Sequence, residues 1–237
     1  MKLSNQHKKD RWPLVNSYFN KLDDLATPYQ SMSIETSFGD THIVLIGPSD
    51  KPPLVLLHEA QSNAALMIEA FKGLLQDFQI YAIDLLGEAN LSAQFSLRKT
   101  DESYAQWMFE LLTRMNIEKG TLVGLGEGGF IAWKSLSFLK NRIVRAFLID
   151  PTWIIAREDS PKEEDYPLIT AEEANCIATP LYIIAGEAYP DFSGRKLLAY
   201  ARTIFPSLQE TLLLETTAVT TTTQGYERIT NFIKDQF

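Results

Sequence analysis

Five acidic residues stand at or just after apolar runs that predict β-strands: Glu59, Glu88, Glu127, Asp150 and Glu187. The carboxyl ends of parallel strands lie along one edge of a sheet, so several of these carboxylates could face one cleft. Close carboxylates raise each other's pKa values and can act as an acid–base pair or bind a divalent cation. Alternatively, most of them point into solvent or cap helices, which suits Glu127 at a helix N-terminus.

The three histidines, His7, His42 and His58, all precede residue 60. A general base needs a partner acid within hydrogen-bond reach, and for His58 only Glu59 or Glu88 could supply one. The single cysteine, Cys176, permits no internal disulfide, and we expect it to pack as a small side chain. The sequence predicts no cofactor and no metal ligand set.

A glycine-rich turn, with Gly124, Gly126, Gly128 and Gly129, separates an apolar run from a helical pattern. Glycine permits backbone conformations and close approaches that other residues do not. The spacing differs from that of a phosphate-binding loop, and the carboxylate of Glu127 would repel an anion. The turn therefore predicts a tight connection between a strand and a helix.

The composition is that of a soluble globular protein: 237 residues, 45% of them hydrophobic, with a net charge of −8. This acidic balance disfavours nucleic acid and anionic membranes as partners, because both bind clustered Lys and Arg. The first ten residues lead into no apolar run, and no apolar stretch approaches the roughly 20 residues that span a bilayer. We therefore expect a cytoplasmic protein.

Alternating strand and helix patterns predict a mostly parallel sheet with helices on both faces. Residues 1–28 form a helical extension packed on the core, and residues 29–237 form a single domain. The predicted strands span residues 31–37, 41–46, 54–57, 79–83, 121–125, 143–149, 181–185 and 210–214, the first two as an antiparallel hairpin. The predicted helices span residues 12–26, 67–75, 101–116, 127–139, 195–205 and 225–237.

Four segments, in this order and spacing, resemble the α/β-hydrolases, particularly a bacterial carboxylesterase-like group. They are Pro52 to His58, Phe38 to His42, Tyr81 to Glu88 and Tyr104 to Trp107. The resemblance runs from about Tyr29 to the C-terminus. It implies the α/β-hydrolase fold.

The resemblance also implies where a catalytic triad would lie, and all three positions lack the required side chain. The nucleophile elbow would place Gly126 where the family has serine. The best match for the acid is Tyr189, with Asp191 two residues further on. The histidine loop would lie near Ala218, in a segment with six threonines in eight residues.

The oxyanion loop would comprise His58, Glu59 and Ala60, and its donors would include the backbone N–H of Glu127. In relatives the histidine is mainly structural, and glycine stands at the position of Glu59. A carboxylate beside a developing oxyanion opposes its stabilisation. Even residual catalysis is therefore disfavoured.

Relatives usually insert a helical cap after the strand that ends near Asp150. Here only a lid segment of thirty residues, 151–180, is present, so we expect little or no cap and an open cleft. Its walls should be mostly apolar and suited to a small molecule. The expected pocket residues are Phe130, Trp153, Tyr189 and Phe192.

These features predict an esterase-like protein that has lost serine-hydrolase catalysis and acts as a small-molecule-binding or regulatory pseudoenzyme. Two alternatives stay open. One is a hydrolase or lyase of a small substrate that uses the carboxylates or His58. The other is a structural partner of an active homologue. The expected partner is a small apolar molecule or another protein. Analogy of fold cannot choose among these functions, because function resides in the site rather than in the fold.

Overall fold

The antiparallel pair at the start of the chain is set by alternating burial. The computed structural model describes residues 15–156, 168–189, 192–215 and 222–237, except for the side chains of residues 188, 189 and 192. Strand β1 (Tyr29–Thr36) pairs along its whole length with β2 (Gly39–Ile46). The turn needs Gly39, whose φ is +105° and whose added Cβ would lie 2.8 Å from the ring of Phe95.

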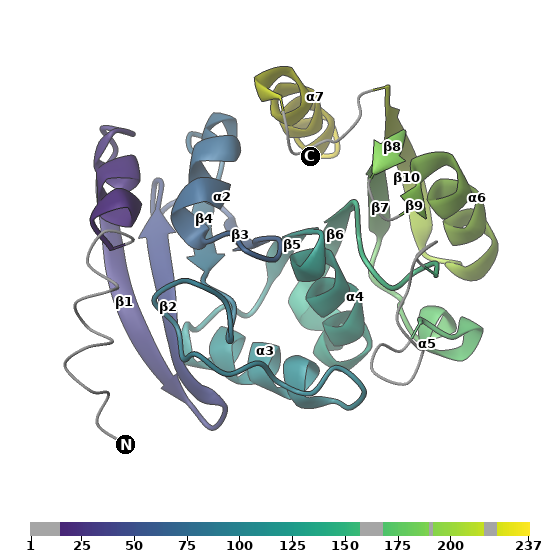
Figure 1. Ribbon diagram of the computed structural model, residues 1–237, viewed down its shortest axis with the longest axis horizontal. Helices are drawn as coiled ribbons and strands as arrows, with labels where there is room; N and C mark the ends of the chain where they lie inside the picture. Colours follow the sequence, from purple (N-terminus) through teal and green to yellow (C-terminus); the bar gives the residue numbers. More distant parts are fainter. Residues whose placement is uncertain (1–14, 157–167, 190–191, 216–221) are drawn as a thin grey trace.

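The remaining strands extend this pair into one twisted sheet (Figure 1). The strand order is β1-β2-β4-β3-β5-β6-β7-β10, and every pair from β4 onward is parallel. The central strands are buried along nearly all of their length, as expected for a sheet covered on both faces. These strands are β3 (Pro53–Leu57), β4 (Gln79–Ile83), β5 (Gly120–Leu125), β6 (Ile143–Ile149) and β7 (Leu181–Gly186). The edge strand β10 (Leu208–Leu214) is mostly half-buried or exposed.

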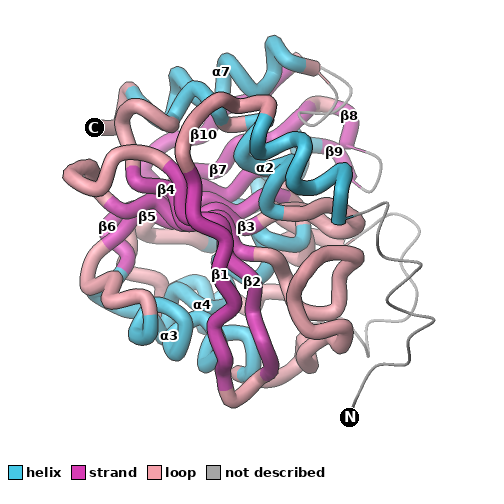
Figure 2. Tube along the Cα trace, turned by 90° about the vertical axis from the view of Figure 1, so that its left-hand side faces the viewer, coloured by secondary structure: helices cyan, strands magenta, loops and turns pink. Residues whose placement is uncertain are grey.

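Helices cover both faces of the sheet, as Figure 2 shows from the side. One face carries α3 (Ser103–Arg114), α4 (Glu127–Leu139) and α6 (Gly194–Ile204), which share a core with β3 and β5. The other carries the helical residues 15–23, α2 (Ala64–Ala70) and α7 (Thr223–Lys234). Tyr18 and Leu22 of the first helix are buried, so this segment packs on the core.

The predicted fold class is confirmed, and the differences are local. The helical pattern over residues 67–75 is two elements, α2 and the 3₁₀ turn η1 (Lys72–Leu74), which meet at Phe71. A second 3₁₀ turn, η2 (Lys140–Arg142), follows α4. Two small elements were not predicted: α5 (Ala171–Asn175) in the lid segment, and the hairpin of β8 (Ala188–Tyr189) with β9 (Phe192–Ser193). Cys176 is exposed at the end of α5, so its predicted packing is wrong.

Candidate functional site

The turn between β5 and α4 has the backbone of a nucleophile elbow. Gly126 connects the two elements with φ 55° and ψ −112°, a conformation that costs an L residue strain energy. Its N–H donates to the carbonyl of Ile149 on the neighbouring strand at 2.9 Å. The elbow is therefore fixed by the sheet, and glycine leaves it without a nucleophile.

The flanking glycines are required by close packing. A Cβ added to Gly124 would lie 2.3 Å from the carbonyl oxygen of Gly128, and one added to Gly128 would lie 2.3 Å from that of Leu57. The N–H of Gly128 also donates to the carbonyl of His58 at 3.1 Å, which joins the elbow to the predicted oxyanion loop. The geometry around Gly126 follows from these contacts and does not depend on the residue at its centre.

Glu127, the first residue of α4, forms an ion pair that the sequence did not reveal. Its Oε1 lies 2.6 Å from Nζ of Lys99, and the two side chains are 12% and 23% exposed. The hydroxyl of Thr152 lies 3.5 Å from the other carboxylate oxygen. The charge expected to oppose an oxyanion is thus partly neutralised. Lys99 comes from the loop before α3, where no periodic pattern marks its position.

His58 is held as a neutral ring. The N–H at Nδ1 donates to its neighbour's carbonyl, that of Glu59, at 2.7 Å, and Nε2 accepts from the backbone N–H of Leu85 at 2.9 Å. The ring is 1% exposed, and burial lowers its pKa despite the nearby carboxylates of Asp84 and Glu88. Nδ1 therefore fixes the ring to its own loop and Nε2 ties that loop to Leu85, just after the end of β4, which is a structural arrangement.

Several carboxylates of the predicted cluster have contacts of their own. Glu88 accepts the backbone N–H of Gln61 at 2.9 Å, and Asp150, fully buried, accepts that of Gly186 at 2.8 Å. Burial raises the pKa of the half-buried Glu59. Glu187 pairs with Arg195 at 2.7 Å. Within the described part of the chain, no group of three His, Cys, Asp or Glu side chains is arranged to hold a metal ion.

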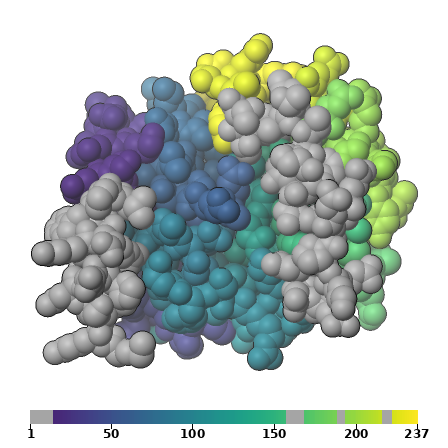
Figure 3. Space-filling model, in the orientation of Figure 1, coloured from purple at the N-terminus to yellow at the C-terminus, as the bar shows by residue number. Residues whose placement is uncertain are grey.

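Tyr226, near the start of α7, lies within electrostatic range of two of these carboxylates and was not singled out from the sequence. Burial raises its pKa, and the carboxylates of Glu59 and Asp150 raise it further. Its ring packs edge-on against Phe71 at 5.3 Å between centroids. The same residue borders a groove of about 570 Å³ between α2 and α7, whose other walls include Leu66, Ala70 and Thr230. These two helices lie along one side of the molecule in Figure 3.

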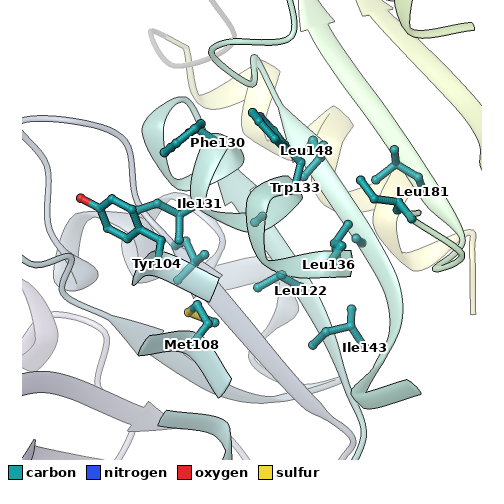
Figure 4. Close-up of a cluster of buried hydrophobic side chains, with 14 of the residues drawn as sticks. Tyr104, Met108, Leu122, Phe130, Ile131, Trp133, Leu136, Ile143, Leu148 and Leu181 are labelled. Atoms are coloured by element: carbon teal, nitrogen blue, oxygen red, sulfur yellow. The ribbon is translucent and has the colours of Figure 1, made fainter. Parts of the chain in front are cut away.

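Two of the residues expected in the pocket wall, Phe130 and Trp153, are buried. Phe130 is fully buried and packs between Tyr104 and Trp133, at centroid distances of 6.1 and 5.2 Å (Figure 4). It faces α3 because it lies on the core side of α4. Trp153 is also almost fully buried, at 4% exposure. The side chains of Tyr189 and Phe192, and all of Asp191 and Ala218, lie outside the described residues.

Comparisons with known proteins agree with this fold. No family model matches the chain. The uncharacterized carboxylesterase nap of Bacillus subtilis (strain 168) is 32% identical over 122 residues, which cover 52% of this chain and 41% of that protein. The 1-acylglycerol-3-phosphate O-acyltransferase ABHD5 of Rattus norvegicus is 26% identical over 141 residues, covering 58% of this chain and 40% of that protein.

A solved structure matches nearly the whole chain. Carboxylesterase CesB (YbfK) from Bacillus subtilis superposes with a TM-score of 0.83 and 20% sequence identity, covering 96% of this chain and 98% of that one. The protein therefore has the α/β-hydrolase fold, and carboxylesterases of Bacillus are among its homologues. The matched segments span less than half the length of the curated relatives. Among the described helices, none has the length and apolar character needed to cross a membrane.

Proposed function

We propose that this protein binds a small acyl-containing molecule at the Gly126 elbow and leaves it unhydrolysed there, as a binding or regulatory member of an esterase-like fold. The observation that carries the proposal is the elbow itself. Its backbone keeps φ 55° and ψ −112° although no side chain needs that conformation for attack. A site shaped by strand and helix packing can outlast the loss of its nucleophile.

The ligand class follows from the surroundings of the elbow and from the relatives. Polar contacts to a carbonyl or carboxylate are offered by the Lys99–Glu127 pair, the Thr152 hydroxyl and the backbone N–H of Glu127 at the start of α4. A carboxylesterase and an acyltransferase are among the named relatives, and both names refer to acyl groups. An ester or a fatty acid therefore suits this site better than a sugar or a nucleotide.

The alternative of a hydrolase or lyase with displaced chemistry has less support, whether it uses His58 or the carboxylates. His58 uses both ring nitrogens in hydrogen bonds to the backbone, so it has no free acceptor for a substrate proton. The carboxylates near the elbow each contact a backbone N–H or a basic side chain, except Glu59, whose raised pKa comes from burial. We therefore do not propose metal-assisted or carboxylate-based hydrolysis.

A thermal-shift screen with two matched variants tests the proposal. Short-chain esters and fatty acids of increasing length are added to the wild type, to Gly126→Leu and to Gly126→Ala. Both substitutions place an L residue at positive φ, but only leucine fills the space beside the turn. A ligand at a hundredfold excess over its Kd stabilises the native state by about 2.7 kcal/mol. For a chain of this size that raises Tm by roughly 5–10 °C.

The expected result is a rise in Tm for the wild type and for Gly126→Ala, and none for Gly126→Leu. Equal shifts in both variants would place the ligand elsewhere. If no ester or fatty acid raises the Tm of the wild type, the result would instead favour the alternative in which this protein is a structural partner of an active homologue.

A further inference from the structure

Three neighbouring strands bring a serine, a histidine and an aspartate together far from the elbow. Ser31 lies on β1 and His42 on β2, and Asp84 follows the last residue of β4. The sheet order places β2 between the other two strands. The backbone N–H of Asp84 donates to the carbonyl of His42 at 3.0 Å, so the histidine and aspartate are held side by side.

The side chains form a continuous hydrogen-bonded chain. Ser31 Oγ lies 2.7 Å from Nε2 of His42, and Nδ1 of the same ring lies 2.9 Å from Oδ2 of Asp84. The aspartate is fully buried, the histidine is 6% exposed, and the serine is exposed on the edge strand. Burial therefore increases from the serine through the histidine to the aspartate, so the reacting oxygen belongs to an exposed residue and the carboxylate is shielded from solvent.

Asp84 is fixed as the acceptor at the buried end. Its Oδ1 accepts the backbone N–H of Ala64 at 2.7 Å, and its Oδ2 also accepts that of Leu91 at 3.3 Å. A carboxylate fixed in this way can accept the N–H of the imidazole at Nδ1, which sets the tautomer of the ring. The lone pair of Nε2 then points to the hydroxyl of Ser31, as a general base requires.

His42 is also held by contacts with the loop after β4 and with the first helix. Its backbone N–H donates to Oγ of Ser92 at 2.8 Å. The ring of Tyr18 packs edge-on against it with centroids 5.6 Å apart, and the tyrosine hydroxyl lies 3.4 Å from Nδ1. These contacts position the ring without occupying Nε2, which faces Ser31.

We propose that Ser31, His42 and Asp84 form a second nucleophilic site, at which Ser31 accepts an acyl group from an activated carboxylic ester. The chain order, Ser–His–Asp, differs from the Ser–acid–His order of this fold. Such triads are recognised by geometry and roles rather than by order along the chain. The proposal is independent of ligand binding at Gly126.

The acylation step uses only groups present at the site. Ser31 Oγ attacks the ester carbonyl carbon while its proton passes to Nε2 of His42. The tetrahedral intermediate collapses, the bond to the leaving oxygen breaks, and Nε2 returns the proton to that oxygen. Water then attacks the acyl-serine, gives its proton to Nε2, and releases the acid as Ser31 regains a proton. The net reaction converts ester and water to acid and alcohol, with no redox change.

The position of the site limits its substrates. Strands β1 and β5 are four positions apart in the sheet, which is about 19 Å at the usual strand spacing. The backbone donors of the elbow therefore cannot reach an oxyanion formed at Ser31. Loss of a single oxyanion donor costs about 10²–10³-fold in rate. The site should accept aryl esters and fluorophosphonates, whose leaving groups need little assistance, and should deacylate slowly.

Ser33 supplies a matched control for the test. It is exposed, lies two residues from Ser31 on the same face of β1, and is the register partner of His42. The full-length wild type, Ser31→Ala and Ser33→Ala are each incubated with an alkyl fluorophosphonate and with p-nitrophenyl acetate. Intact mass and fragment mass spectra locate any adduct, and absorbance records nitrophenolate release.

The expected result is one adduct per chain on Ser31 and a stoichiometric burst of nitrophenolate, both lost in Ser31→Ala and retained in Ser33→Ala. An unlabelled wild type, or an adduct that persists in Ser31→Ala, would overturn the proposal. Neither result bears on the Tm shifts at Gly126, so failure of this site and failure of the proposed ligand site are distinguishable.

Discussion

The elbow at Gly126 and the hairpin site, formed by Ser31, His42 and Asp84, have opposite features of a nucleophilic site. The elbow has the strained turn, the close glycine contacts and the start of a helix, but it lacks a nucleophile. The hairpin has no elbow, but it has a serine and a histidine on regular strands, hydrogen-bonded in series with the aspartate that follows β4. Backbone geometry and side-chain chemistry are therefore separable in this fold, because tight packing fixes the first and local contacts fix the second.

The largest expected effect tests the hairpin site at its buried end. Asp84→Asn keeps an oxygen for the N–H of Ala64 but no longer fixes the proton of His42 at Nδ1. We expect phosphonylation of Ser31 to slow by about 10³–10⁴-fold, as for a triad with the wrong tautomer. The measurement is the second-order rate of labelling. Asp77→Asn, at a surface ion pair with Lys234, is the control and should label normally.

The second prediction concerns the helix that supports the elbow. Phe130→Ala should lower the free energy of unfolding by about 3–5 kcal/mol, because the ring is fully buried between two aromatic side chains. Phe130→Leu, which retains most of the volume, should lose less. Urea unfolding measures both. If Phe130→Ala leaves the free energy of unfolding nearly unchanged, the ring is not part of the core and the prediction that Phe130 lines a cleft gains support.

The ion pair beside the elbow should contribute a smaller amount. Lys99→Met leaves the carboxylate of Glu127 without its cation and should cost about 1–3 kcal/mol. The double variant Lys99→Met with Glu127→Gln removes the uncompensated charge and should recover most of that loss. If the double variant is as unstable as the single one, Lys99 acts through packing of its methylene chain and not through its charge.

The pH dependence of stability tests the neutral ring of His58. Burial lowers its pKa in the native state, whereas in the unfolded chain histidine titrates near pH 6.5. Below that value the unfolded state binds a proton that the native state does not, so stability falls as pH falls. The slope from this group approaches about 1.4 kcal/mol per pH unit. His58→Gln should reduce the slope between pH 7.5 and 5.5, and an unchanged slope would contradict a neutral His58.

The smallest expected effect comes from restoring the missing serine. In a Ser31→Ala background, Gly126→Ser should raise p-nitrophenyl acetate hydrolysis by less than about tenfold. The general base that would add about 10²–10⁴-fold is lacking, since every histidine precedes residue 60. Initial rates against the Ser31→Ala parent measure the gain. Robust, saturable turnover would reveal a base near the elbow.

The fold could be predicted because periodicity and glycine placement are local signals. The predicted bounds of the helix 127–139 and of the strand 143–149 are those of α4 and β6. α4 begins directly after Gly126, and β6 ends directly before Asp150. Both flanking residues have a positive φ, 55° and 43°, which neither the helix nor the strand adopts. The elbow could be located from the same signal, because its glycines are spaced by steric need.

The side-chain partners could not be predicted, because they join segments distant in the chain. Lys99 reaches Glu127 from an irregular loop, and nothing in its neighbours marks that contact. His42 and Asp84 lay within the segments that carry the family resemblance, but their contact depends on β2 and β4 being neighbours. The side of α4 on which Phe130 lies depends on the rotation of a helix that is apolar over most of its surface.

Asp84 also has a consequence for local opening of the native state. Its two oxygens receive the amides of Ala64 and Leu91, which are 27 residues apart, and contact the ring of His42. Each amide must break its hydrogen bond to this fully buried carboxylate before it can exchange with solvent deuterium. We therefore expect the two amides to exchange at similar rates, as parts of one cooperative unit that includes His42 of β2. Local unfolding at the start of α2 must therefore break the contacts of this carboxylate before it extends to the β1–β2 hairpin.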